Sequence, residues 1–312
     1  MGKLSGVVCA LALAVMPTLI GAGPLLDALR QARQNSLEDG TGQGRDAVAM
    51  PAGSRKLENL AYGHTAGERL DVYVPAEAHQ APVLLMVHGG AWRFGDKQSA
   101  GVVAGKWQRW GGQGWVVVSM DYGLLPDVAV DEQARQVARA LAWVQRHAGE
   151  WGGDGRQVVL MGHSAGAHLV SLLTASATLA RDNGVRDWPG TVVLDSAAVD
   201  VAALMRARHL PLYDHAFGTD PAYWDDLSPL RQLGPGRPPM LLVCSSRRQE
   251  SCPNAQRLQE RAQVLGDRAT VLAEDLSHMQ INRELGLPGP YTTAVERFMS
   301  ALSPELARHL AQ

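Results

Sequence analysis

Gly162-His163-Ser164-Ala165-Gly166 follows an apolar run, Val158 to Met161, and precedes a helical pattern from Ala167 to Leu179. A serine between glycines at the junction of a buried strand and a helix is typical of a nucleophile elbow. In that turn the serine Oγ is exposed at the top of a sheet. Glycine suits the flanking positions because a Cβ there would clash with the neighbouring strand and helix. The pattern predicts that Ser164 is a nucleophile; the alternative is an ordinary small-residue turn.

Short apolar runs alternate with helical patterns on both sides of the pentapeptide. The predicted strands are an early antiparallel strand at 68–75 and buried strands at 83–87, 115–119, 158–161, 192–194, 240–244 and 270–273. The predicted helices lie around 98–111, 131–148, 165–180, 255–265 and 291–302. Continuous Val/Leu runs indicate strands that are covered on both faces. The alternation therefore predicts an α/β fold with a mostly parallel central sheet, and ligand chemistry beyond the carboxyl ends of its strands.

The N-terminal residues predict export. Lys3 precedes an apolar stretch from residue 6 to residue 20, and small residues follow, so residues 1–22 have the pattern of a signal peptide cleaved after Ala22. The stretch contains Pro17 and is short for a membrane span, so we expect no stable span in the mature chain. The alternatives are an uncleaved anchor and a misassigned start. The expected location is periplasmic or secreted.

The remaining chain is long enough for one large domain. We predict a flexible lead-in at 23–56, with a short helix from Pro24 to Gln34, and one domain at 57–312. Within that domain the proline-rich segment 200–239 is a possible cap over the site. The formal net charge is −2 and no long basic block occurs, which argues against a nucleic-acid partner.

Loss of Cys9 with the signal peptide would leave only Cys244 and Cys252. Two cysteines eight residues apart in an exported chain indicate a local disulfide. The alternative is one buried thiol and one exposed thiol. We expect no metal site, because further ligands at suitable spacing are missing.

A serine nucleophile needs a base that takes its proton and a carboxylate that orients the base. His278 follows the last predicted strand by five residues and is the predicted base. His309 lies in the C-terminal tail with no strand before it, whereas His209 and His215 fall in the cap-like segment. The alternative for His278 is a surface loop histidine.

Two carboxylates are candidates for the acid. Glu250 follows the strand at 240–244 and lies inside the suspected disulfide loop, so we favour it. Asp195 ends the preceding strand and is the alternative acid; it could equally cap the helix that follows. Asp275 is only three residues from His278 and is expected to belong to the same turn.

The amide of Ala165 and the glycines of His88-Gly89-Gly90-Ala91-Trp92 are suited to form an oxyanion hole. Glycines after the strand at 83–87 let the backbone approach a substrate carbonyl, and we expect His88 to orient this loop. Trp92 is a candidate for lining the substrate pocket, although a packing role fits it equally well.

Together these segments resemble the α/β-hydrolases, and most closely the hormone-sensitive-lipase-like and bacterial feruloyl-esterase-like branch. The motifs that carry the resemblance, over roughly residues 60–300, are His88-Gly89-Gly90-Ala91-Trp92, Gly95-Asp96-Lys97, Asp121-Tyr122, Trp151-Gly152-Gly153-Asp154 and Gly162-His163-Ser164-Ala165-Gly166-Ala167-His168. The resemblance implies an α/β-hydrolase fold, no cofactor, Ser164 as nucleophile, His278 as base, and Gly89, Gly90 and Ala165 as oxyanion donors. His163, inside the elbow motif, is taken as a substrate-binding candidate.

The chain departs from the family pattern twice. Ala91 replaces a third glycine common in related esterases, and the usual Gly-x-x-Asp acid motif is absent, with the stretch from Cys244 to Cys252 in its place.

The expected activity is hydrolysis of carboxylic esters of small to medium acyl groups through an acyl-enzyme, so the expected partner is a small-molecule ester. One alternative is an arylformamidase-like amide hydrolase. Another is a catalytically dead α/β-hydrolase scaffold that acts as a binding module.

Overall fold

The computed structural model of the chain describes residues 2, 48–99 and 101–311. The predicted signal peptide, the short helix at 24–34 and most of the lead-in lie outside these residues, apart from the exposed Gly2.

Eight strands form one sheet in the order β1-β2-β4-β3-β5-β6-β7-β8. Their bounds are β1 Arg55–Ala61, β2 Arg69–Val74, β3 Ala81–Val87, β4 Val116–Met120, β5 Gly153–His163, β6 Gly190–Leu194, β7 Met240–Ser245 and β8 Ala269–Glu274. Strand β2 pairs antiparallel with β1 and β4, and the pairs from β4 through β8 are parallel. The mostly parallel sheet and the α/β-hydrolase fold are therefore confirmed.

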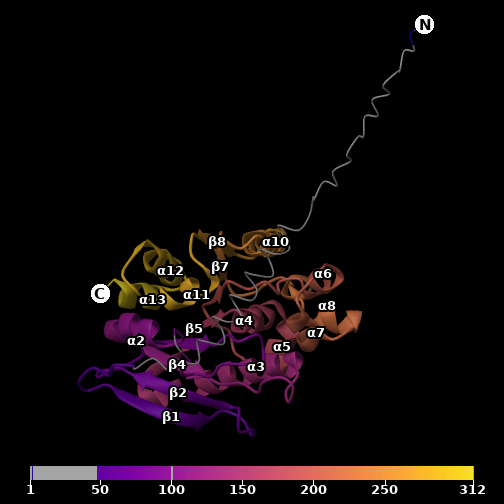
Figure 1. Ribbon diagram of the computed structural model, residues 1–312. Coiled ribbons are helices and arrows are strands. Elements are labelled where there is room, and N and C mark those ends of the chain that lie inside the picture. Colours follow the sequence, from indigo (N-terminus) through magenta and orange to yellow (C-terminus); the bar gives the residue numbers. More distant parts are fainter. Residues whose placement is uncertain (1, 3–47, 100, 312) are drawn as a thin grey trace.

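Helices cover both faces of the sheet (Figure 1). The helices outside residues 200–239 are α2 Ala104–Trp110, α3 Val130–His147, α4 Ala165–Ala175, α5 Ala177–Asp182, α10 Ser251–Val264, α11 His278–Arg283, α12 Pro290–Ser300 and α13 Pro304–Leu310, with 3₁₀ helices at Gly111–Gln113 and Ala148–Trp151.

Alternate residues of the central strands point into two separate cores. In β3, Val83, Leu85 and Val87 pack with side chains of α3, α4 and α10, whereas Leu84 and Met86 pack with side chains of α2, α12 and α13. All five side chains are fully buried. This two-sided burial explains why the strands read as unbroken apolar runs.

Strand β1 was missed by the sequence analysis. It begins at Arg55, two residues before the predicted start of the domain. All of its residues are exposed or half-buried, and it lies at the edge of the sheet, so it lacks the apolar pattern of a buried strand.

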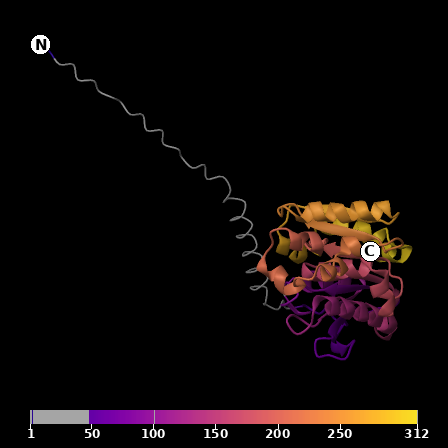
Figure 2. The ribbon, with the colours of Figure 1, turned by 90° about the vertical axis from the view of Figure 1, so that its right-hand side faces the viewer.

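The segment 200–239 folds into four short helices beside the sheet. These are α6 Val201–Arg206, α7 Pro211–Phe217, α8 Pro221–Asp226 and α9 Pro229–Gln232. Three of them begin with proline, whose fixed φ suits the first helical position and whose missing N–H costs nothing there. The views of Figures 1 and 2 place these orange segments at one end of the sheet, away from the edge strand β1.

Candidate functional site

Ser164 occupies a strained turn between β5 and α4. Its φ is 56° and its ψ is −116°, a conformation that non-glycine residues rarely adopt. A Cβ at Gly162 would lie 2.5 Å from the carbonyl oxygen of Gly166, and a Cβ at Gly166 would lie 2.3 Å from that of Val87. The two glycines are therefore needed for the close approach of β5, α4 and β3 that produces this turn.

His278 opens α11 and faces the same pocket as Ser164. Its helix begins with a capping box, in which the Ser277 side chain accepts from the backbone of Gln280 and the Gln280 side chain accepts from the backbone of Ser277. The Nδ1 atom of His278 lies 2.6 Å from Oδ2 of Asp195. With Nδ1 bound to a carboxylate, Nε2 is the nitrogen that can accept a proton from a serine.

Asp195, the alternative acid of the sequence analysis, is the carboxylate that the structure brings to His278. It follows β6, has a φ of 57°, and has a fully buried side chain. Burial alone would raise its pKa, but the charge of Arg248 and hydrogen bonds from His278 and Ser251 outweigh it and hold the pKa of Asp195 well below its usual range. The residue is therefore a permanent anion at the end of its strand.

The favoured acid, Glu250, lies elsewhere. It is exposed at the N-cap position of α10 and makes no side-chain cap bond there. The turn after β7 directs Arg248 and Ser251 inward onto Asp195, so Glu250 between them faces solvent. The structure therefore differs from the preference for Glu250: the position after β7 provides partners for Asp195, and the carboxylate that contacts His278 follows β6.

His163 also differs from its predicted role. It is buried and donates from Nε2 to the backbone carbonyl of His278 over 3.0 Å, with the two ring centroids 4.5 Å apart. Burial, followed by the positive charge that His278 can carry, places the pKa of His163 well below its ordinary value. The residues that line the pocket do not include it, so its position is that of a support for His278 and not of a substrate contact.

The predicted oxyanion loop lies against Ser164. A Cβ at Gly89 would lie 2.9 Å from the Cβ of Ser164, so only glycine permits this approach. Behind the loop, the rings of His88 and Tyr122 stack with centroids 4.4 Å apart, and the Tyr122 hydroxyl donates to the carbonyl of His88 over 3.0 Å. Lys97 continues the support through an ion pair of 2.7 Å with Asp121.

The amide of Ala165, the first residue of α4, lies on the other side of Ser164 and lines the pocket. Gly90, whose φ is 116°, turns the loop so that the carbonyl of Gly90 accepts from the amide of Phe94 at 2.8 Å. Of the predicted donors, Gly89 and Ala165 thus approach Ser164 from two segments, and Gly90 follows Gly89 in the loop.

A cavity of about 90 Å³ contains Ser164 and His278. Its cap-side wall is apolar and comes from Leu210, Leu212 and Tyr213. Trp92 forms part of the wall and packs its ring on Tyr213 and Phe217, with centroids 6.1 and 4.9 Å away. Trp92 therefore joins the oxyanion loop to the segment 200–239, which encloses one side of the site.

His168, in α4 below the site, is held in its neutral form. Its Nδ1 accepts from Trp92 Nε1 over 3.2 Å, and its Nε2 donates to the carbonyl of Leu227 over 2.8 Å. Burial lowers the pKa of His168 to about 4, although the bond to Leu227 partly opposes this shift. In the sequence, His168 is recognisable only as part of the motif around Ser164. Its bonds to Trp92 and Leu227 join segments that are far apart in the chain, so no local pattern predicts them.

The lowered pKa of His168 predicts acid destabilisation. In the unfolded chain His168 binds a proton near pH 6.5, but in the folded chain it does so only near pH 4. The contribution of neutral His168 to the free energy of unfolding is therefore complete above pH 6.5 and is lost as the pH falls towards 4. The expected loss at pH 4 is about 3 kcal/mol of unfolding free energy. Urea unfolding at pH 7 and pH 4 measures it.

His168→Gln is the matched variant, since glutamine does not titrate. We expect it to be less stable at pH 7 but to have a pH dependence shallower by about 3 kcal/mol. The buried residues His88 and His163 also have lowered pKa values, so the unfolding free energy of the variant should still depend on pH to some extent. Equal pH dependence in the two proteins would contradict the assignment to His168.

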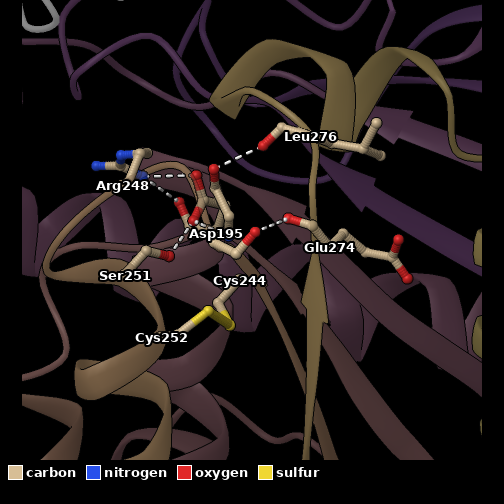
Figure 3. Close-up of a disulfide and its surroundings, with 9 residues drawn as sticks. Asp195, Cys244, Arg248, Ser251, Cys252, Glu274 and Leu276 are labelled. Carbon is tan, nitrogen blue, oxygen red and sulfur yellow. Dashed lines mark hydrogen bonds and ion pairs between the residues drawn. A yellow bond between two sulfur atoms is a disulfide. The ribbon is translucent and has the colours of Figure 1, made fainter.

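The disulfide between Cys244 and Cys252 is present and closes the turn after β7 (Figure 3). Figure 3 shows Arg248 and Ser251, both within this closed loop, directed at Asp195. The amide of Ser245 also donates to Asp195 Oδ1 over 3.1 Å. The disulfide thus closes the segment whose side chains hold Asp195.

The double variant Cys244→Ser, Cys252→Ser is expected to lose about 2.5 kcal/mol of unfolding free energy, because a loop of this length is no longer closed in the unfolded chain. Urea unfolding without reductant measures the difference. Reductant should destabilise the unsubstituted protein and leave the stability of the double variant unchanged. The prediction is contradicted if reductant opens the disulfide of the unsubstituted protein without lowering its unfolding free energy.

Among the described residues, no group of three or more His, Cys, Asp or Glu side chains could hold a metal ion. No helix in that part of the chain is long and apolar enough to span a membrane.

A family model described as BD-FAE matches residues 70–257. Kynurenine formamidase from Salmo salar is 31% identical over 151 residues, which cover 48% of this chain and 47% of that protein. Esterase LipC from Mycobacterium tuberculosis is 28% identical over 206 residues, which cover 60% of this chain and 49% of that protein. The chain thus spans about half the length of these curated relatives. Among solved structures, esterase B from Lactobacillus rhamnosis superposes with a TM-score of 0.69 at 23% identity, covering 91% of this chain and 96% of that one.

Proposed function

Since the chain belongs to the BD-FAE family, we propose that it is a serine hydrolase that cleaves carboxylic esters of small to medium acyl groups. The observation that carries the proposal is the pairing of His278 Nδ1 with Asp195 Oδ2 at 2.6 Å, in a pocket that also contains Ser164. Serine, carboxylate and histidine in this chain order are the components of acyl transfer in this fold. Similarity to esterase LipC of Mycobacterium tuberculosis supports the same chemistry.

The first half of the reaction acylates the enzyme. Ser164 Oγ bonds to the ester carbonyl carbon while its proton passes to Nε2 of His278, and the negative charge of Asp195 stabilises the imidazolium. The carbonyl oxygen becomes an oxyanion, to which the amides of Gly89, Gly90 and Ala165 can donate. Cleavage of the bond to the alcohol oxygen then releases the alcohol, which takes the proton from His278.

The second half restores the free serine. Water loses a proton to His278 and attacks the acyl carbon, and collapse of the intermediate breaks the bond to Ser164 Oγ, which takes the proton back. The product acid leaves. All proton transfers use one histidine, so no cofactor is part of the proposal.

The size and walls of the pocket favour short acyl groups. A cavity of about 90 Å³ with apolar side chains from Leu210, Leu212 and Tyr213 suits a few methylene groups. Reaction with a labelled fluorophosphonate, followed by peptide mapping, tests the chemistry directly. Label on Ser164 supports the hydrolase; an intact, folded protein that does not react supports the dead scaffold.

Amide hydrolysis is the second candidate, because kynurenine formamidase is among the relatives. A panel of p-nitrophenyl acetate, p-nitrophenyl butyrate, methyl ferulate and N-formylkynurenine separates the two. Preference for the esters by kcat/KM supports the first candidate, and preference for N-formylkynurenine supports the second.

We also propose that the protein is exported to the periplasm or secreted. The disulfide between Cys244 and Cys252 supports an oxidising compartment. Intact-mass measurement of the protein from fractionated cells tests this: a chain lacking residues 1–22 outside the cytoplasm supports export, and a full-length cytoplasmic chain contradicts it.

A further inference from the structure

Arg248 and His278 share one oxygen of Asp195. Arg248 Nη1 lies 2.6 Å from Asp195 Oδ2, and His278 Nδ1 lies 2.6 Å from the same atom. The two nitrogens are themselves 3.1 Å apart. Asp195 is fully buried and the Arg248 side chain is 18% exposed, so the guanidinium reaches the acid from the rim of the pocket.

The other oxygen of Asp195 is held independently. Oδ1 accepts from the amide of Ser245 over 3.1 Å and from the hydroxyl of Ser251. Figure 3 shows Ser251 and Arg248 reaching Asp195 from the same disulfide-closed turn. The orientation of the carboxylate is therefore fixed by Ser245 and Ser251 even without Arg248.

The hydrogen positions follow from the chemistry of the three groups. A guanidinium only donates, and an ionised carboxylate only accepts. His278 Nδ1 must carry hydrogen to donate to Asp195, so its 3.1 Å approach to Arg248 brings together two donors that share an acceptor. Protonation of His278 would then create a second positive charge beside the guanidinium, which Coulomb repulsion opposes.

We propose that Arg248 is a positioning residue that acts through Asp195 and His278: it offsets part of the carboxylate charge and so limits how strongly Asp195 favours the charged form of the imidazole. This inference rests on the proposed hydrolase function. Arg248 would then affect the pH range in which the enzyme is active, whereas Ser245 and Ser251 fix the orientation of the carboxylate.

The other charged groups around His278 come from several elements. The ring of His163 of β5 lies beside it at a tilt, and burial places the pKa of His163 well below its ordinary value. Lys106 of α2 is buried and donates to the backbone and side-chain oxygens of Asn282 in α11. Four further titratable residues belong to nearby segments. These are Glu274 at the end of β8, Asp275 in the turn after it, Glu284 at the end of α11 and Tyr291 in α12. Substituting Arg248 alone leaves all of these in place.

The test compares kcat/KM from pH 4 to pH 9 in three variants. Arg248→Gln removes the charge, Arg248→Lys keeps it, and Arg247→Gln is the matched control. Arg247 is the neighbouring arginine, 46% exposed in its side chain and paired with Asp275 at 2.8 Å.

In Arg248→Gln we expect the acidic limb of the profile to move up by about one pH unit, because removing a unit charge at this distance changes proton affinity about tenfold or more. Activity at pH 5 should then fall about tenfold, with activity at pH 8 within about threefold of the unsubstituted protein. Arg248→Lys and Arg247→Gln should keep the original limb. An unmoved limb in Arg248→Gln, or an equal loss at every pH, would overturn the proposal.

Titration of the His278 ring by NMR gives a readout that needs no turnover. The midpoint should rise by about one unit in Arg248→Gln and stay unchanged in Arg247→Gln. If Ser164 does not react with fluorophosphonate, the hydrolase proposal fails; if the ring midpoint does not move, the role of Arg248 fails. The two failures are therefore distinguishable.

Discussion

Ser164→Ala is expected to lower kcat for ester hydrolysis about 10⁶-fold, because the members of a serine triad act as a unit and loss of the nucleophile removes nearly the whole effect. The measurement is hydrolysis of p-nitrophenyl acetate, with fluorophosphonate labelling as a second readout. Both should be lost in the variant.

Ser171→Ala is the matched control for this experiment. Ser171 lies further along α4 and is buried, and its hydroxyl donates to the carbonyl of His168 in the same helix. Its loss should leave the activity within about twofold, since only a local hydrogen bond disappears. Near-full activity in Ser164→Ala would show that the turn after β5 is not a nucleophile elbow.

Asp195→Asn is expected to lower kcat about 10⁴-fold, whereas Glu250→Gln should leave it within about twofold. An amide at position 195 carries no charge to stabilise the imidazolium and can donate to Nδ1, which favours the wrong tautomer of His278. Asparagine tolerates the φ of 57° at this position, so the variant should remain folded.

Circular dichroism and the urea midpoint check the fold of both variants. A loss in Glu250→Gln comparable to that expected for Asp195→Asn would restore Glu250 as the acid. Full activity in Asp195→Asn would contradict the proposed triad, since the carboxylate that contacts His278 would then have no part in the reaction.

The sequence was most informative where one local pattern determines the structure. The run at 158–161 and the pentapeptide after it predicted β5, the turn and α4, because buried strands and glycine-flanked turns have strict local requirements. Edge strand β1 could not be found this way, since none of its residues is buried.

The acid was harder to predict because its identity depends on a contact between distant segments. Asp195 and His278 are separated by 83 residues, and both Asp195 and Glu250 come near the ends of neighbouring strands. Two sequence features pointed to Asp195: it directly follows a buried strand, and the usual Gly-x-x-Asp pattern is missing after the next one. The preference for Glu250 gave greater weight to the disulfide loop, which instead supplies Arg248 and Ser251.

The hydrogen bond from His163 to the carbonyl of His278 links the proposed nucleophile to the proposed base. His163 directly precedes Ser164, so the end of β5 carries both the attacking serine and a tether to the first residue of α11. A small shift of this strand end would carry the base along with the nucleophile, and their spacing would vary less than the position of either one.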